Sequence, residues 1–242
     1  MFNRDILQRL IVLDIETVSL APNFEELPER LKPHWEKKSM SLQKNLDEPL
    51  PADAFFEERA AIYAEFAKVV CISFGYLKFE GEVPHLKVKS CCDSDEKVLL
   101  QEFGELLNRF PAHKKWLLCA HNGKEFDFPF LGRRFLVNSL ELPTMLQIQG
   151  KKPWEIQHLD TMELWKFGDF KSFVSLDLLT AILDIPSPKS DMDGSMVGSC
   201  FWQDQDLEKI KTYCEQDVLA TAQVLLRFAR ENLVAADDVH SV

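Results

Sequence analysis

Acidic side chains recur in three short segments of this chain, and one tyrosine accompanies them. The segments read Asp-Ile-Glu at 14–16, Asn-Gly-Lys-Glu-Phe-Asp at 122–127 and Tyr-Cys-Glu-Gln-Asp at 213–217. Two carboxylates held about 4 Å apart repel by roughly 4 kcal/mol at an effective dielectric of 20. Four of them at one place would resist folding or take up protons unless cations lay among them. Oxygen ligands favour Mg²⁺ or Mn²⁺ over zinc. If the segments meet, they predict a site for two divalent cations that cuts a phosphodiester.

The first segment is the most informative by itself. Asp14 and Glu16 follow the apolar run Leu10–Leu13, which is typical of a buried strand. Alternate strand residues point to the same face and lie about 6.6 Å apart. The two carboxylates are thus spaced to flank two metal ions roughly 3.5–4 Å apart. The alternative is a strand end that reaches solvent, although an unpaired carboxylate beside an apolar run carries a desolvation penalty.

The other two segments are ambiguous when each is taken alone. Asp127 also fits an ordinary acid at a helix N-terminus, where the helix dipole favours it. Tyr213 and Asp217 are four residues apart in a predicted helix, so they share a face at about 6 Å along its axis. Such a pair also occurs on solvated helices. Asp160 fits a helix cap better than a fifth site acid, and His121 fits a hydrogen-bonded loop residue.

The elements that would position these groups follow from the hydrophobic pattern. Strands are predicted at 10–13, 69–74, 116–120 and 156–159. Residues 77–90 contain Glu80-Gly81 between alternating segments, which predicts a hairpin turn into a further strand. Helices are predicted at 53–67, through Phe110 after an Asp93/Glu96 capping box, and from Pro129 to about Asn138. Further helices are predicted after an Asp160/Glu163 capping box, at 175–183 and from Gln205 to about Asn232. This order predicts an α/β fold, a mixed central sheet covered by helices. Residues 20–66 are rich in Glu, Lys and Pro, which indicates an insertion or flap within a single domain spanning 1–242.

The net charge of −11 argues against a histone-like or transcription-factor role, since phosphate neutralisation drives non-specific duplex binding. It argues less against a nuclease, because bound metal ions neutralise an acidic site. Basic residues do occur in adjacent pairs. Each pair is either an ordinary solvated surface feature or part of a track that contacts phosphates. These pairs are Lys37-Lys38, Lys114-Lys115, Arg133-Arg134 and Lys151-Lys152.

The sequence also predicts a location. No apolar run approaches the roughly 20 residues of a membrane helix, and no secretory signal is visible. The six cysteines form neither a CxxC pair nor a zinc spacing, which favours buried or free thiols in a reducing compartment. We therefore expect a cytoplasmic protein without membrane contact.

Taken together, the acidic segments resemble the three motifs of the DEDD superfamily of 3′–5′ exonucleases. The matching residues are Asp14-x-Glu16, Asn122-x₃-Phe126-Asp127 and Tyr213-x₃-Asp217. The tyrosine resembles that of the tyrosine-type (DEDDy) subclass. The arrangement is most similar to the exonuclease domains of family B DNA polymerases and to stand-alone bacterial proteins predicted to share that fold. The stretch Ser187–Gly194 also resembles the stand-alone proteins, and the resemblance spans roughly residues 10–230.

The resemblance implies a ribonuclease H-like fold with two bound metal ions, Mg²⁺ or Mn²⁺. By this analogy Asp14, Glu16, Asp127 and Asp217 hold the metals. Tyr213 would position the attacking water, because a phenol with an ordinary pKa of about 10 is mostly protonated at neutral pH. Thr17, Asn122 and Phe126 would contact the terminal nucleotide, with core packing as the alternative for Phe126.

The implied activity is that of a metal-dependent 3′–5′ exonuclease acting on single-stranded nucleic acid. We expect it to favour 3′ ends of DNA and to release nucleoside 5′-monophosphates. Because 242 residues leave no room for a polymerase domain, any proofreading or repair role would need a polymerase or repair protein in trans. Two alternatives remain open: a 3′–5′ exoribonuclease, including a deadenylase, and a non-catalytic nucleic-acid-binding module on the same fold.

Overall fold

A six-stranded mixed sheet forms the centre of the protein. The computed structural model describes residues 3–169, 173–186 and 192–241, so residues 187–191 of the Ser187–Gly194 stretch lie outside the described residues. The strands are β1 (Leu10–Ser19), β2 (Ala67–Glu80), β3 (Val83–Cys92), β4 (Leu117–Ala120), β5 (Leu159–Asp160) and β6 (Val239–Ser241). Their order is β5-β4-β1-β2-β3-β6. The β1–β2 and β2–β3 pairs are antiparallel, whereas β1–β4, β4–β5 and β3–β6 are parallel.

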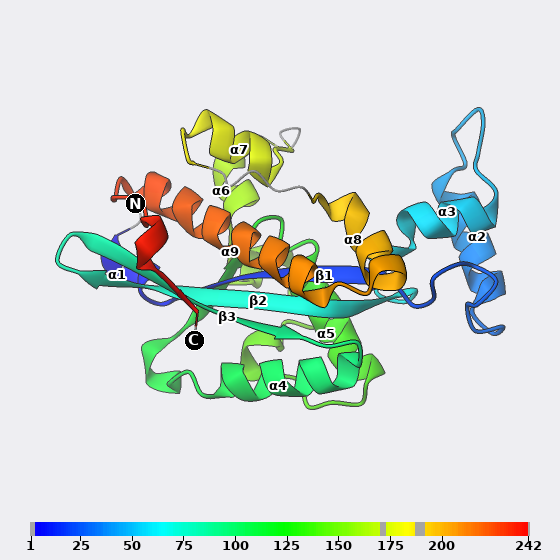
Figure 1. Cartoon of the computed structure of the whole chain (residues 1–242), viewed down its shortest axis with the longest axis horizontal. Coiled ribbons are helices and arrows are strands. Elements are labelled where there is room, and N and C mark those ends of the chain that lie inside the picture. Colours follow the sequence, from blue (N-terminus) through cyan, green and yellow to red (C-terminus); the bar gives the residue numbers. More distant parts are fainter. Residues whose placement is uncertain (1–2, 170–172, 187–191, 242) are drawn as a thin grey trace.

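Helices cover both faces of this sheet, as the sequence predicts. The described helices are α1 (Arg4–Leu7), α2 (Lys32–Leu42), α3 (Ala52–Arg59), α4 (Glu96–Asn108), α5 (Asp127–Val137), α6 (Thr161–Lys166), α7 (Leu176–Ile182), α8 (Val197–Ser199) and α9 (Leu207–Ala229). The long α9 crosses one face, while α4 and α5 lie on the other (Figure 1). Among the described helices, none combines the length and apolarity needed to cross a bilayer.

The alternation of β1 decides which face carries the acidic residues. Leu13 and Ile15 pack into the core beneath α4 and α5. Val12 points the other way and packs with Val218 of α9. Since side chains alternate along a strand, Asp14 lies on the α9 side of the sheet.

Three local predictions are wrong. The strand predicted at 156–159 forms only at Leu159–Asp160, the two residues that pair with β4. The helix predicted over 53–67 ends at Arg59, because a short 3₁₀ turn and a bend bring Phe66 back against Trp35 before β2 begins. The capping box predicted for Asp93 and Glu96 does not form. Asp95 caps α4 by accepting a hydrogen bond from the backbone N–H of Lys97.

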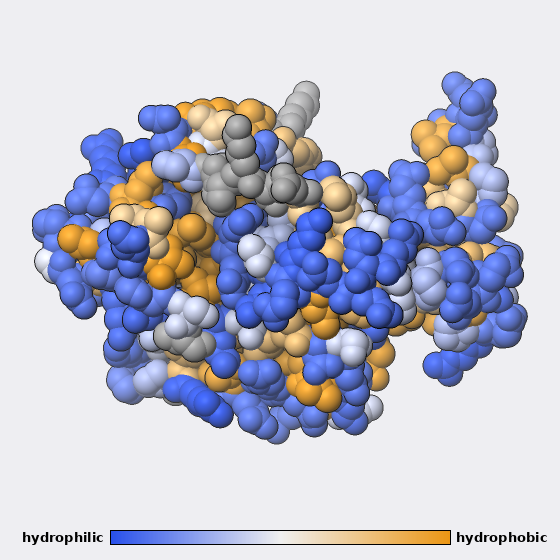
Figure 2. Space-filling view, in the orientation of Figure 1, coloured by the Kyte–Doolittle hydropathy of each residue, from blue (hydrophilic) through white to orange (hydrophobic). Residues whose placement is uncertain are grey.

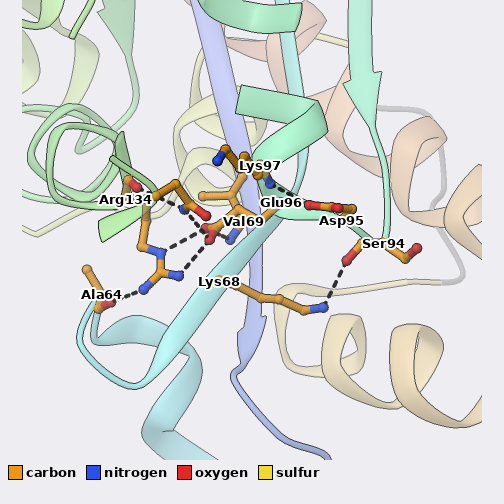
Figure 3. Close-up of polar contacts among 9 residues, drawn as sticks. Ala64, Lys68, Val69, Ser94, Asp95, Glu96, Lys97 and Arg134 are labelled. Atoms are coloured by element: carbon orange, nitrogen blue, oxygen red, sulfur yellow. Dashed lines mark hydrogen bonds and ion pairs between the residues drawn. The ribbon is translucent and has the colours of Figure 1, made fainter. Parts of the chain in front are cut away.

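Glu96 instead turns into the interior and pairs with buried Arg134 of α5 (Figure 3). The guanidinium donates to both carboxylate oxygens at 2.8 and 2.6 Å and to the carbonyl of Ala64 at 2.8 Å. The backbone N–H of Val69 and the amide of Asn138 also donate to the carboxylate. This network joins α4, α5, the start of β2 and the end of the 20–66 segment.

The 20–66 segment builds a small core of its own. Trp35 is fully buried among Phe55, Phe56 and Phe66, and its indole N–H donates to the carbonyl of Ala52 at 2.7 Å. The helices α2 and α3 form a lobe beside the main sheet, and hydrophilic residues cover most of its visible surface (Figure 2). Its interpretation as an insertion or flap stays a prediction.

The cysteine prediction needs one correction. Cys71 of β2 and Cys92 of β3 face each other in register, 4.3 Å apart at Cα, and form a disulfide. The pairing of the two strands places them together, and sequence spacing does not reveal it. The four other cysteines are free and buried, as expected: Cys91, Cys119, Cys200 and Cys214.

Candidate active site

The structure brings all four predicted carboxylates together. Asp14 and Glu16 come from the middle of β1, Asp127 begins α5 just after β4, and Asp217 lies in α9. The charges of Glu16, Asp127 and Asp217 all raise the pKa of Asp14. The backbone N–H of Ile15 donates to the Asp127 carboxylate, which ties this residue directly to β1.

Burial is the main cause of the raised pKa values in this cluster. Glu16 is 7% exposed and Asp127 is 3% exposed. Burial first, and the neighbouring carboxylates second, raise the pKa values of Asp14 and Glu16 well above their usual range. Burial also raises the pKa of Asp127 to about 8. A cluster that holds protons at neutral pH unless cations are present is what the sequence predicts of a metal site.

Tyr213 and Asp217 contact each other, as their spacing in α9 predicts. The phenol donates a hydrogen bond to the Asp217 carboxylate, which partly opposes the effect of burial and leaves its pKa at about 6. Burial and the charges of Asp217, Glu16 and Asp14 raise the pKa of Tyr213 far above its ordinary value. Tyr213 therefore keeps its proton at neutral pH.

Cys214 is a neighbour of the cluster that the sequence analysis missed. Its thiol donates to Oδ2 of Asp14 at 3.3 Å, and ligand atoms of Asp14, Glu16 and Cys214 all lie within 4.8 Å of one another. Burial raises the pKa of this thiol well above its usual range, so it stays neutral. Because the thiolate is the metal-binding form, the donor set remains one of carboxylate oxygens. The sequence did contain a signal for this contact. Cys214 lies three residues before Asp217 in the predicted helix, on the side that faces the sheet.

Asp160 holds the loop that carries the second acidic segment. One of its oxygens accepts from the backbone N–H of Asn122 at 3.0 Å, and the other accepts from that of Lys124 at 3.0 Å. The same carboxylate caps α6 through the N–H groups of Met162 and Glu163. The helix cap predicted for Asp160 is thus confirmed, whereas the second half of the predicted capping box does not form. The side chain of Glu163 forms an ion pair with Lys124.

The three residues expected to contact a nucleotide differ in their surroundings. The Thr17 hydroxyl already donates to the carbonyl of Ala61 at 2.8 Å. Asn122 has a left-handed backbone (φ 63°) and lines a cavity of about 660 Å³. Phe126 is half-buried and packs against Phe130, with ring centroids 5.3 Å apart. Their contact with a nucleotide stays a prediction.

Other predictions about nearby residues have clear outcomes. His121 contacts the hydroxyl of Thr161 and the carbonyl of Val174, both at 2.9 Å, which confirms a hydrogen-bonded loop histidine. The two side chains of the Arg133-Arg134 pair lie in different surroundings. Arg134 is buried against Glu96, whereas Arg133 lines the same cavity as Asn122.

The mixed sheet and its helical layers define an α/β protein of the ribonuclease H-like fold, similar to a solved family B DNA polymerase. That polymerase is from the hyperthermophilic archaeon Pyrobaculum calidifontis, with a TM-score of 0.52 and 13% sequence identity. The similarity covers 91% of this chain and 24% of the polymerase, so the chain spans about a quarter of the length of that protein. At this identity the likeness shows the fold alone.

The family of the chain follows from its sequence. Residues 61–237 match the family described as a predicted 3′–5′ exonuclease related to the exonuclease domain of PolB. The chain belongs to this family, which confirms the resemblance drawn from the acidic segments. No curated protein matches the sequence. The matched range contains Asp127, Tyr213 and Asp217, whereas Asp14 and Glu16 precede it. The tertiary structure alone joins these two residues to the others.

Proposed function

We propose that this chain is a metal-dependent 3′–5′ exonuclease that hydrolyses phosphodiester bonds at the 3′ ends of single-stranded nucleic acid. The observation that carries the proposal is the convergence of Asp14, Glu16, Asp127 and Asp217 from three separate elements. A protein that only bound nucleic acid would gain nothing from four buried carboxylates, since they repel phosphate. DNA is the favoured substrate, and nucleoside 5′-monophosphates are the expected products.

The four carboxylates are the residues that would hold two divalent cations, Mg²⁺ or Mn²⁺. Their oxygen-only chemistry suits these hard cations. Burial first, and the neighbouring carboxylates second, raise the pKa values of Asp14 and Glu16, and bound cations would offset both effects. When bound, such a metal pair would activate water and stabilise the charge on the leaving 3′ oxygen.

The surrounding side chains would position the attacking water and the end of the substrate strand. Tyr213 retains its proton and is placed to orient a water molecule beside Asp217. Asp160 holds the backbone of the loop between β4 and α5, so that Asn122 and Phe126 stay next to the reacting end of the strand. Thr17 sits at the bulge that follows Glu16 in β1 and completes the proposed nucleotide contacts. The proposed setting is the cytoplasm, with a polymerase or repair protein acting in trans.

The decisive experiment compares the wild-type chain with Asp14→Asn and Asp217→Asn. A 5′-labelled single strand incubated with Mg²⁺ or Mn²⁺ should give a nested ladder of shortened products. Each substitution should lower the rate by at least about a hundredfold, because metal ligands supply several kcal/mol of transition-state stabilisation. Asp14→Asn should also raise the melting temperature of the metal-free protein near neutral pH, since it removes a buried acid that ionises readily only in the unfolded chain.

Asp47→Asn is the matched control, because Asp47 is an exposed loop residue of the α2–α3 lobe. It should leave the rate and the melting temperature unchanged. Full activity in both Asp14→Asn and Asp217→Asn would refute the assignment. Parallel digestion of matched DNA and RNA strands decides between the deoxyribonuclease and the exoribonuclease, since the 2′-hydroxyl distinguishes them.

A further inference from the structure

A second cavity lies on the sheet face opposite Asp14 and Glu16. The hairpin of β2 and β3 extends beyond the end of α4, which leaves this part of the sheet without a helix over it (Figure 1). The resulting cavity has a volume of about 700 Å³. This volume falls within the range of roughly 300–1,000 Å³ that is usual for small-ligand sites.

Aromatic rings form one wall of the cavity. Tyr76 of β2 contacts Phe110 and Trp116, which lie between α4 and β4. The ring centroids are 5.9 Å apart for Tyr76 and Phe110 and 6.0 Å apart for Tyr76 and Trp116, and both pairs meet edge to face. All three rings are half-buried, so part of each remains accessible.

Cations form the rest of the rim. In a protein whose net charge is −11, five basic residues line this cavity and Glu80 is the one acidic residue among its described lining residues. The basic residues are Lys78, Lys87, Lys89, Arg109 and Lys114. Within the described part of the chain, only Lys89 among them forms an ion pair, with Glu102 at 3.7 Å.

The register of the hairpin places the cations beside the rings. Lys87 of β3 is the direct cross-strand partner of Tyr76, and such partners lie on the same face of the sheet. The ammonium of Lys78 lies 5.7 Å from the Tyr76 ring centroid, and that of Lys114 lies 5.9 Å from the Trp116 ring centroid. Flat apolar surfaces and unpaired positive charge thus occupy the same hollow.

We propose that this cavity binds a nucleotide unit, with the base against the aromatic wall and the phosphate among the lysines. Base–aromatic stacking together with lysine–phosphate contact is the chemistry by which proteins hold single-stranded nucleic acid without reading its sequence. The site is separate from the carboxylate cluster, because the two lie on opposite faces of the sheet. Its occupant is either a free mononucleotide or one nucleotide of a strand, and both present the same chemical groups.

Binding can be measured without catalysis. In buffer with a chelator and no divalent cation, fluorescence anisotropy of a labelled eight-residue oligothymidylate should report saturable binding. Unlabelled thymidine 5′-monophosphate serves as the competitor. The double charge reversal Lys87→Glu/Lys114→Glu should weaken binding by about tenfold or more, and each lost phosphate contact should reduce the slope of log affinity against log salt by about 0.7. Hydrogen exchange should slow on binding in residues 76–89 and 109–116.

Lys37→Glu/Lys44→Glu is the matched control, because both lysines are exposed in the α2–α3 lobe and the net charge changes equally. It should retain most of the affinity. Competition by the mononucleotide assigns a small-molecule site, whereas binding of the oligonucleotide alone assigns a contact with a strand. Equal affinity in the two double variants, or no binding by either probe, would overturn the proposal. Since no hydrolysis is measured, this result is independent of the Asp14→Asn experiment.

Discussion

At the scale of single residues, the surroundings of Tyr213 define what it can do. Its hydroxyl donates to Asp217, and burial together with the carboxylates around it raises its pKa, so that loss of the proton is costly. A phenol in this state donates a hydrogen bond and does not act as a base at neutral pH. This agrees with the positioning role proposed for it.

We expect Tyr213→Phe to lower kcat by about 10–100-fold, as the loss of one hydrogen bond to a charged group costs roughly 1.5–3 kcal/mol. Metal affinity should change little. The pKa of Asp217 should rise, because the lost hydrogen bond had lowered it. The measurement is kcat against pH. Tyr63→Phe in the lobe is the control, and an unchanged kcat and pH profile in Tyr213→Phe would contradict the role.

The carboxylate cluster also predicts how stability depends on pH. In the folded protein the pKa of Asp217 is about 6 and that of Asp127 is about 8, above the value of about 3.9 in an unfolded chain. The folded state therefore binds more protons, and the free energy of unfolding of the metal-free protein should fall as pH rises from about 4 to 8.

Thermal denaturation at pH 5, 6.5 and 8, with and without Mn²⁺, tests this expectation. Added metal should raise the melting temperature most at pH 8, where the ligands are most readily ionised. Asp217→Asn should make the metal-free decline shallower. A metal-free stability that increases over this range would contradict the raised pKa values.

At the scale of elements, the loop between β4 and α5 depends on Gly123. A Cβ atom at this position would lie 2.4 Å from Cβ of Ala120 and 3.0 Å from the ring of Phe128. Both neighbours are fully buried, so neither can move away easily. The absence of a side chain here lets the loop carry Asn122 and Asp127 close against the sheet.

Gly123→Ala should therefore destabilise the protein by about 1–3 kcal/mol, the usual cost of overpacking, and should lower activity by displacing Asp127. Chemical denaturation and the exonuclease assay measure the two effects. Gly132→Ala in α5 is the control, because a Cβ there meets no atom within 4 Å. It should be neutral or slightly stabilising, since alanine favours helix more than glycine does. Equal stability of the two variants would show that the loop can adjust.

At the scale of the whole molecule, the buried pair of Glu96 and Arg134 connects the lobe to the body. Arg134 reaches the carbonyl of Ala64 at the end of the 20–66 segment while it holds Glu96. Val69, which also donates to Glu96, is the register partner of Thr17 next to the acidic cluster. The pair thus links the position of the lobe to that of β1.

Arg134→Met should cost about 3–5 kcal/mol of stability, because it leaves the Glu96 carboxylate buried without its partner. Denaturant unfolding measures the loss. Arg133→Met is the adjacent control at an exposed position and should change stability by less than about 0.5 kcal/mol. The double variant Glu96→Leu/Arg134→Met should recover part of the loss, and a single variant as stable as wild type would show that the pair contributes little.

Local features of this protein were predictable from its residue pattern. The apolar runs predicted strands β1, β2 and β4, and the spacing of Tyr213 and Asp217 predicted their contact along α9. Local signals succeed there because alternation and helical periodicity are properties of neighbouring residues. For the same reason the cap by Asp160 was predictable, as the capping residue and its helix are adjacent.

Contacts between groups far apart in the chain depend on how the elements pack. Cys214 donates to Asp14 across a separation of 200 residues, and the disulfide joins Cys71 to Cys92 through strand pairing. Glu96 looked like part of a helix cap and became half of a buried ion pair. A residue pattern shows which face a side chain occupies but not which element will cover that face. Long-range packing therefore placed four repelling carboxylates around one point on one side of the sheet, and left lysines and aromatic rings together on the other.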